Sequence, residues 1–118
     1  MGIKKGTSNT VSSALDFVLR VTEGEDTGMI FVLSKERMIV GRSKVGHVDI
    51  EIHEVFAAPS HFEIYWDESI NSHAVRNWKA KIPVIINGHA LEINEAKELR
   101  LGDEIRVGNT KLIYERAA

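Results

Sequence analysis

The sequence predicts an all-β domain, a sandwich of about ten or eleven mostly antiparallel strands. Short segments in which apolar and polar residues alternate recur from Asp16 onward, as in strands with one buried face. Tight turns containing Gly, Asn or Asp separate these segments, and none has the apolar spacing of an amphipathic helix. Closely spaced short strands are typical of β-sandwiches. A chain of 118 residues is long enough for one such domain with a core.

The composition is that of an ordinary globular domain and argues against several other classes of protein. Hydrophobic residues make up 43% of the chain and charged residues 27%, as in ordinary globular domains. A net charge of −2 is too close to neutral to indicate attraction to nucleic acid. The lack of cysteine excludes a disulfide framework and a thiolate zinc site, and favours a cytoplasmic location. No apolar run approaches the roughly 20 residues that cross a bilayer, so we expect no membrane insertion.

The chain opens with a polar segment rich in Gly, Ser, Thr, Asn and Lys. We expect residues 1–15 to be a disordered tail or a cloning remnant, and residues 16–116 to form the domain. Alternation is clear at once, because Phe17, Leu19 and Val21 fall on one face of an extended segment. Strands are expected at residues 17–22, 29–33, 38–40, 48–52, 61–66, 73–78, 84–86, 90–93, 99–101, 104–107 and 111–114.

The turns and the core follow from the same pattern. Asn87-Gly88 is the strongest hairpin signal, because a type I′ turn needs positive φ at both central residues. Residues 94–98 fit a single helical turn, too short to stand as a helix. Eight side chains are expected to be largely buried: Phe17, Leu19, Phe31, Ile39, Ile50, Ile64, Ile105 and Ile113.

The segment from Met38 to His61 contains the candidate site. Gly41 frees the backbone where a short apolar strand ends, and Arg42 places a fork of donors there. Such a guanidinium can bind a phosphate bidentately. It can equally form a surface ion pair with Asp49 or Glu51, worth at most about 1 kcal/mol. Spacing alone leaves both readings open.

Three motifs in this order resemble the forkhead-associated (FHA) family of phosphothreonine-binding modules. They are Gly41-Arg42-Ser43 with Asp49-Ile50, Ile86-Asn87-Gly88 with Leu91, and the run from Leu101 to Gly108. The resemblance extends from Phe17 to Tyr114 and implies an FHA-like β-sandwich in which Arg42 contacts the phosphate. It also implies structural roles for Gly41, Asn87, Gly88 and His61. His61 would brace the neighbouring loop, so we expect His61→Ala to cost about 1–3 kcal/mol through an unsatisfied partner.

The same resemblance places apolar residues where the family has hydrogen-bonding side chains. The family's serine three residues before the histidine corresponds to Ala58. Pro59 follows; it lacks an N–H and favours extended geometry at Ala58. Ser60 is a poor replacement, since it directly precedes His61 and a one-residue slip in a strand reverses the facing side. The family's later Ser or Thr and Asn fall on Ala80 and Ile82.

Several loop side chains are candidates to supply charge or hydroxyls beside Arg42. They are Ser43, Lys44, Ser60, Lys79 and Lys81. The alternative is that the lysines are ordinary solvated side chains. The remaining histidines are scattered without the i, i+4 helical spacing of a zinc site, so no metal ligands and no cofactor are expected.

We therefore expect an FHA-type protein–protein interaction module and not an enzyme. In the first hypothesis, phosphothreonine recognition is weakened or lost, and the domain docks a protein partner or its own copies without phosphorylation. In the alternative, it is a functional phosphothreonine-peptide binding module that uses Arg42 and loop lysines in signalling. A third hypothesis, an enzymatic or metal-dependent function, has only dispersed histidines in its favour.

Overall fold

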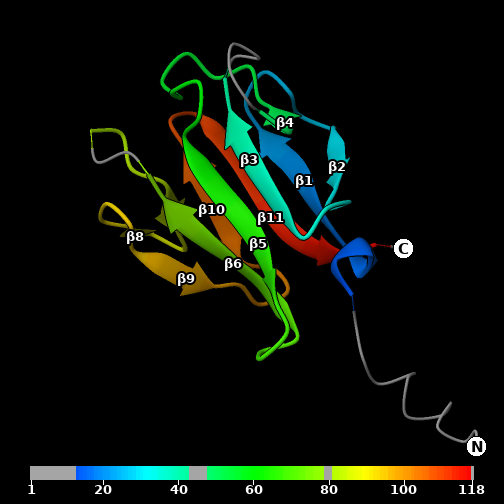
Figure 1. Cartoon of the computed structure of the whole chain (residues 1–118). Coiled ribbons are helices and arrows are strands. Elements are labelled where there is room, and N and C mark those ends of the chain that lie inside the picture. The colour runs from blue at the N-terminus through cyan, green and yellow to red at the C-terminus, as the bar shows by residue number, and fades with distance from the viewer. Residues whose placement is uncertain (1–12, 43–47, 79–80, 118) are drawn as a thin grey trace, which may run out of the picture.

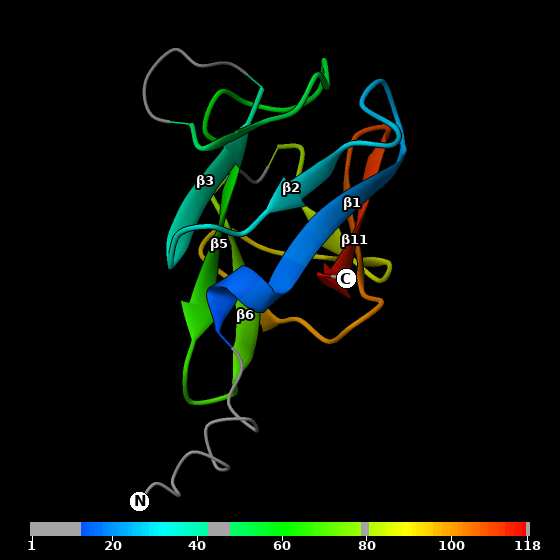
Figure 2. The same cartoon turned by 90° about the vertical axis from the view of Figure 1, so that its right-hand side faces the viewer.

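The computed structural model describes residues 13–42, 48–78 and 81–117, and these form two β-sheets packed face to face. Figure 1 shows the strands along the sandwich, and Figure 2 shows the two layers from the side. Within these residues there are eleven strands, preceded by a short 3₁₀ helix, η1 (Ala14–Asp16). The predicted all-β sandwich is confirmed.

Each sheet brings together strands from distant parts of the chain. The six-stranded sheet contains, in spatial order, β2 (Ile30–Val32), β1 (Phe17–Glu23), β11 (Thr110–Arg116), β10 (Glu104–Val107), β7 (Ile85–Ile86) and β8 (His89–Ala90). The five-stranded sheet contains β4 (Ile50–Glu51), β3 (Arg37–Gly41), β5 (Phe62–Asp67), β6 (Ser72–Asn77) and β9 (Ala96–Glu98). Neighbouring strands among these are antiparallel, apart from the parallel pair β3 and β4.

The core lies between the sheets, and six of the eight predicted side chains are buried. They are Phe17, Leu19, Ile39, Ile50, Ile64 and Ile105. Phe31 is half-buried and packs against the core. Ile113 is also half-buried, because Leu112 and Tyr114 occupy the buried face of β11 and alternation turns Ile113 to the other face.

The segment between β8 and β10 also differs from the prediction. Residues 94–98 do not form a helical turn: Asn94 has φ 67° and residues 96–98 form β9, which pairs with β6. Residues 99–101 are not a strand. The buried Leu99 donates its N–H to the His73 carbonyl, 2.8 Å away, and the chain then turns through Gly102. The strands predicted at 48–52 and 90–93 are shorter, covering Ile50–Glu51 and His89–Ala90.

The hairpin between β7 and β8 has the backbone that its sequence requires. Asn87 and Gly88 both have positive φ, 50° and 86°, as in a type I′ turn. The Asn87 amide also accepts the N–H of Glu104 at 2.9 Å and donates to Asp103 Oδ1 at 2.8 Å. The hairpin is thereby fixed to the start of β10.

Candidate functional site

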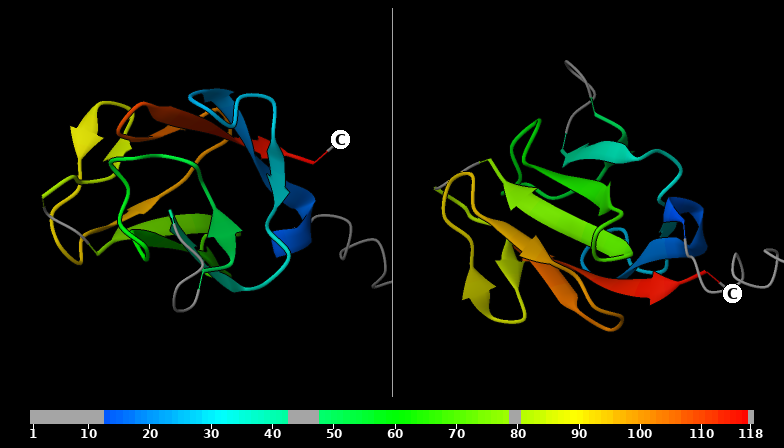
Figure 3. Two further views of the ribbon diagram at one scale, coloured as in Figure 1. Left: turned by 90° about the horizontal axis from the view of Figure 1, so that it is seen from above. Right: turned by 60° about the horizontal axis from the view of Figure 1, so that its bottom comes forward.

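Several loops meet at one end of the sandwich, seen from above in the left panel of Figure 3. His53, in the loop between β4 and β5, donates its backbone N–H to Asp26 of the β1–β2 turn at 2.7 Å, and its Nδ1 lies 2.8 Å from the same carboxylate. This carboxylate raises the pKa of His53, through its hydrogen bond and then its charge. On the other side, Glu54 accepts the Asn109 N–H at 3.1 Å and the Thr110 hydroxyl at 2.7 Å. The β4–β5 loop is therefore joined to two neighbouring turns.

Gly41 occupies the position where β3 passes beneath this loop. A Cβ at Gly41 would overlap the carbonyl oxygen of Pro59 and would lie 2.9 Å from that of Ala58. The Gly41 carbonyl accepts the Ile52 N–H at 2.8 Å. Glycine is thus required by the close approach of two backbone segments, and this approach sets the place of the next residue, Arg42.

Arg42 projects from the end of β3 and is exposed. Its backbone N–H donates to Ala58 O and its Nε–H to Ala57 O, both at 2.9 Å. Among the residues that the structure describes, it has no ion pair with Asp49, whose carboxylate instead accepts Lys35 Nζ at 2.8 Å. The two terminal amino groups of Arg42 make no hydrogen bond to the described part of the chain.

Among the described residues of the β4–β5 loop, Ala58 and Pro59 border Arg42 and have side chains without a hydrogen-bond donor. Ala58 is half-buried and donates its N–H to Nδ1 of His61 at 2.9 Å. Pro59 is exposed. Ser60 lines a different hollow of about 320 Å³, on the side of β3 where Trp78 lies. Arg42 is not among the residues lining that hollow.

His61 joins the β4–β5 loop to the segment before β7. It is buried, with 1% of its surface exposed. Its Nδ1 accepts the Ala58 N–H, so the proton lies on Nε2, which donates to Ile82 O at 2.5 Å. Ile82 is half-buried and Lys81 is exposed. Four predicted site positions, Ser43, Lys44, Lys79 and Ala80, lie outside the described residues.

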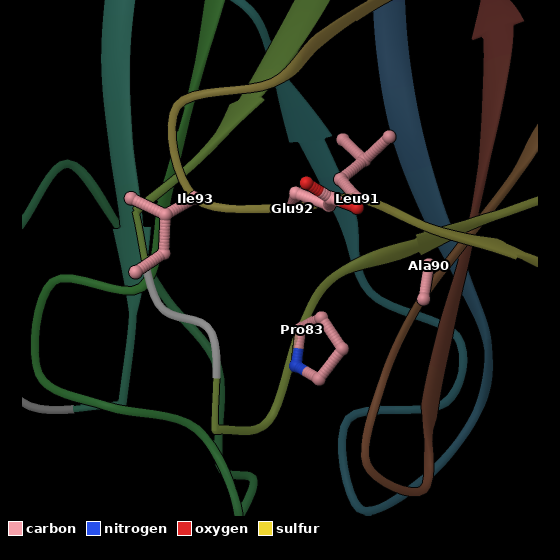
Figure 4. Close-up of a pocket in the computed structure, with 5 residues that line it drawn as sticks. All are labelled: Pro83, Ala90, Leu91, Glu92 and Ile93. Atoms are coloured by element: carbon pink, nitrogen blue, oxygen red, sulfur yellow. The ribbon is translucent and has the colours of Figure 1, made fainter.

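An open hollow of about 570 Å³ adjoins this side of the loop end. Figure 4 shows Pro83 on one wall and Ala90, Leu91, Glu92 and Ile93 on the other. The buried Asn77 supports both walls, since its Nδ2 donates to Leu91 O at 2.9 Å and its Oδ1 accepts the Val84 N–H at 3.4 Å.

Sequence reasoning missed two features of the loop end. The first is the set of polar supports, His53, Glu54 and Asn77, which bond to partners far along the chain. The second is the tip of the β4–β5 loop, where Val55 and Phe56 are 78% and 52% exposed. In the sequence, the signal for this exposed tip was a pair of large apolar residues in the loop between two predicted strands.

Among the described residues, no cluster of three or more His, Asp or Glu side chains is arranged to hold a metal ion. The described part of the chain also contains no helix that is long and apolar enough to span a membrane.

The chain thus forms a β-sandwich of two sheets in which Arg42 is exposed beside the β4–β5 loop. The FHA domain model matches residues 38–108, more than half of the chain. The protein therefore belongs to the FHA family, whose members are interaction modules.

Solved structures agree with this family assignment. An FHA domain of an Arabidopsis thaliana hypothetical protein has a TM-score of 0.76 at 20% identity, with 91% of this chain and 92% of that chain covered. The FhaA FHA domain, solved in complex with the intracellular domain of Rv3910, gives 0.68 at 19% identity, covering 84% and 99%. A domain from a study of phosphothreonine-dependent FHA interactions gives 0.69 at 19% identity, covering 86% and 97%. No curated protein sequence matches significantly.

Proposed function

We propose that this FHA domain docks a protein partner through its loop end without requiring a phosphate on that partner. One observation carries the proposal: the exposed guanidinium of Arg42 is bordered by the backbone of Ala57 and by Ala58 and Pro59, which offer it no hydroxyl group. Of the residues that the structure describes beside this guanidinium, a phosphate group placed there would meet the Arg42 cation and the apolar side chains of Ala58 and Pro59.

The energetic consequence of this arrangement is large. A phosphothreonine carries about −1.5 to −2 charges near pH 7, and each charge-assisted hydrogen bond contributes about 1.5–3 kcal/mol. Two missing contacts therefore weaken binding by about a hundredfold or more, because each 1.4 kcal/mol is tenfold. What remains on Arg42 is an exposed electrostatic interaction that salt screens.

The solved relatives support a protein as the partner. The FhaA FHA domain was solved with the intracellular domain of Rv3910, and a second relative comes from work on phosphothreonine-dependent interactions. By analogy, this chain recognises a protein segment, and we place that segment at the loop end where Arg42 is exposed. Under this proposal the partner can also be a second copy of the chain. Size-exclusion chromatography across a concentration series tests for such self-association.

A second candidate function is phosphothreonine binding by Arg42 assisted by loop lysines. The observation in its favour is that Arg42 and Lys81 are both exposed, and that only Nε of the Arg42 guanidinium bonds to the described part of the chain. Arginine and lysine together can neutralise a phosphate without hydroxyl donors.

Titration with a phosphothreonine peptide library and its unphosphorylated twin separates the two candidates. We expect weak or undetectable phosphate-dependent binding in moderate salt. Tight binding of the phosphorylated library alone would overturn the proposal and favour the second candidate.

A rescue series adds a positive control to this titration. Restoring polar side chains with Ala58→Ser, Ala80→Ser and Ile82→Asn should increase affinity for phosphothreonine peptides, and Arg42→Ala should abolish the gain. Pro59→Arg belongs in the series, because the proline ring restricts the loop. A restored pocket that still ignores phosphopeptides would show that the loops are aligned wrongly with the family.

A further inference from the structure

The tip of the β4–β5 loop presents two large apolar side chains to solvent beside the candidate site. The loop turns between Glu54 and Ala57, closed by the Ala57 N–H to Glu54 O bond of 3.0 Å, with Val55 and Phe56 at the corners. They are 78% and 52% exposed. The Ala57 carbonyl that ends this turn is also the acceptor for Nε of Arg42, at 2.9 Å. An apolar tip and an exposed cation therefore share one short segment.

The tip is held in place rather than left loose. Glu54 is only 4% exposed, and its carboxylate accepts three hydrogen bonds, from Phe56 N at 3.2 Å, Asn109 N at 3.1 Å and the Thr110 hydroxyl at 2.7 Å. Gly108 lets the neighbouring turn approach closely, since a Cβ there would lie 3.0 Å from Cβ of Phe56. Because the backbone that carries Phe56 is held, a partner that covers the ring does not have to order the loop, which makes the ring a favourable binding anchor.

The one positive charge that Arg42 supplies equals the charge of a carboxylate and is smaller than that of a phosphate. The guanidinium of Arg42 carries one positive charge, and with Nε bonded to Ala57 its two terminal amino groups can donate two parallel hydrogen bonds to a carboxylate. The Glu54 carboxylate in the same loop faces inward, toward Asn109 and Thr110. It therefore does not compete for this position.

From these features we propose that the loop end recognises an unphosphorylated peptide segment in which an aspartate or glutamate adjoins a large apolar residue. The carboxylate binds Arg42, and the apolar side chain covers Phe56 and Val55. This inference rests on the proposed function, because it names the chemistry of the partner that docks without phosphate.

Labelled peptides that differ only at two central positions test the inference by fluorescence polarisation. The probes are 12-residue peptides with randomised flanks and a centre of Glu-Leu, Gln-Leu, Glu-Ser or phosphothreonine-Leu. We expect the Glu-Leu peptides to bind about tenfold more tightly than the Gln-Leu peptides, which lack the ion pair with Arg42. We expect the same roughly tenfold difference from the Glu-Ser peptides, which lack the apolar side chain that covers Phe56. Arg42→Gln should remove the preference for Glu over Gln, and Phe56→Ser should remove the preference for Leu over Ser.

Matched controls come from the other end of the sandwich, where Arg100 and Leu101 are also exposed. Arg100→Gln and Leu101→Ser should leave all four affinities unchanged. Equal unfolding midpoints for the four variants would show that the domain stays folded in each.

The outcomes separate the inference from the proposed function. Equal binding of Glu-Leu and Gln-Leu overturns the acidic preference while phosphate-independent docking stands. A preference for phosphothreonine-Leu overturns both. If none of the four peptide probes binds, the inference is overturned. The titration with the phosphothreonine library and its unphosphorylated twin then decides the proposed function.

Discussion

Replacement of His61 by alanine should destabilise the domain strongly, because its buried imidazole ring forms hydrogen bonds with two different loops. Its Nδ1 accepts the Ala58 N–H at 2.9 Å, and its Nε2–H donates to Ile82 O at 2.5 Å. With 1% of its surface exposed, the ring and its two hydrogen bonds are shielded from bulk water in the unchanged chain. The substitution thus leaves a donor and an acceptor without partners, and a cavity the size of the ring.

The structure indicates a larger loss of stability for His61→Ala than one unsatisfied hydrogen-bond partner would cause. A buried group left unsatisfied costs about 1–3 kcal/mol, so two such groups cost about 2–6 kcal/mol. Some relaxation of the loops offsets part of this, and we expect a loss of about 3–4 kcal/mol in the free energy of unfolding. That is a large share of the 5–15 kcal/mol typical of a domain.

Urea unfolding followed by the fluorescence of Trp66 and Trp78 measures this loss. The midpoint should fall while the slope with urea stays constant. His89→Ala is the matched control: His89 is exposed and contacts Glu95 at 3.2 Å, and its removal should cost less than about 0.5 kcal/mol. A loss below about 1 kcal/mol for His61→Ala would refute the bridging role.

Three further predictions use the same unfolding assay. Gly41→Ala should cost about 3 kcal/mol, because its Cβ would overlap the Pro59 carbonyl oxygen; a neutral effect would contradict that close approach. Glu54→Ala should cost about 3 kcal/mol by leaving its three donors unsatisfied, and Glu54→Gln should cost less. Burial lowers the pKa of His73 to about 4 from 6.5, so the unfolded chain binds the extra proton between these values. Stability should therefore fall by about 3 kcal/mol as pH drops from 6.5 to 4, and His73→Asn should flatten this slope relative to the unchanged chain.

The parts of the fold that the sequence predicted are those with a strong local signal. Alternation located β1, β5 and β6, and the Asn87-Gly88 pair located a hairpin through its demand for positive φ. β9 has no such signal, because all three of its residues are exposed at a sheet edge and two carry charges. Its strand geometry comes from pairing with β6, which is a tertiary contact.

The candidate site likewise contains residues whose position the sequence predicts and residues whose role it does not reveal. Arg42 follows a recognisable strand and glycine, so its position at a loop end could be predicted from nearby residues. Glu54 could not be recognised as a support, since its partners Asn109 and Thr110 are 55 and 56 positions away. A polar residue in a loop has no periodicity that reveals burial, and its role follows only from the three-dimensional path of the chain.

The bracing of the loop end does not depend on the side chains at positions 58 and 82. His61 bonds to the backbone N–H of Ala58 and the backbone carbonyl of Ile82, and Arg42 bonds to the carbonyl of Ala57. Side chains at positions 58 and 82 can therefore change from polar to apolar without removing any of these bonds. It follows that Ala58→Ser should alter stability by less than about 0.5 kcal/mol, as for a surface substitution, while changing ligand affinity. A large loss of stability in Ala58→Ser would show that the apolar side chain itself holds the loop, and that ligand chemistry and loop shape cannot vary separately.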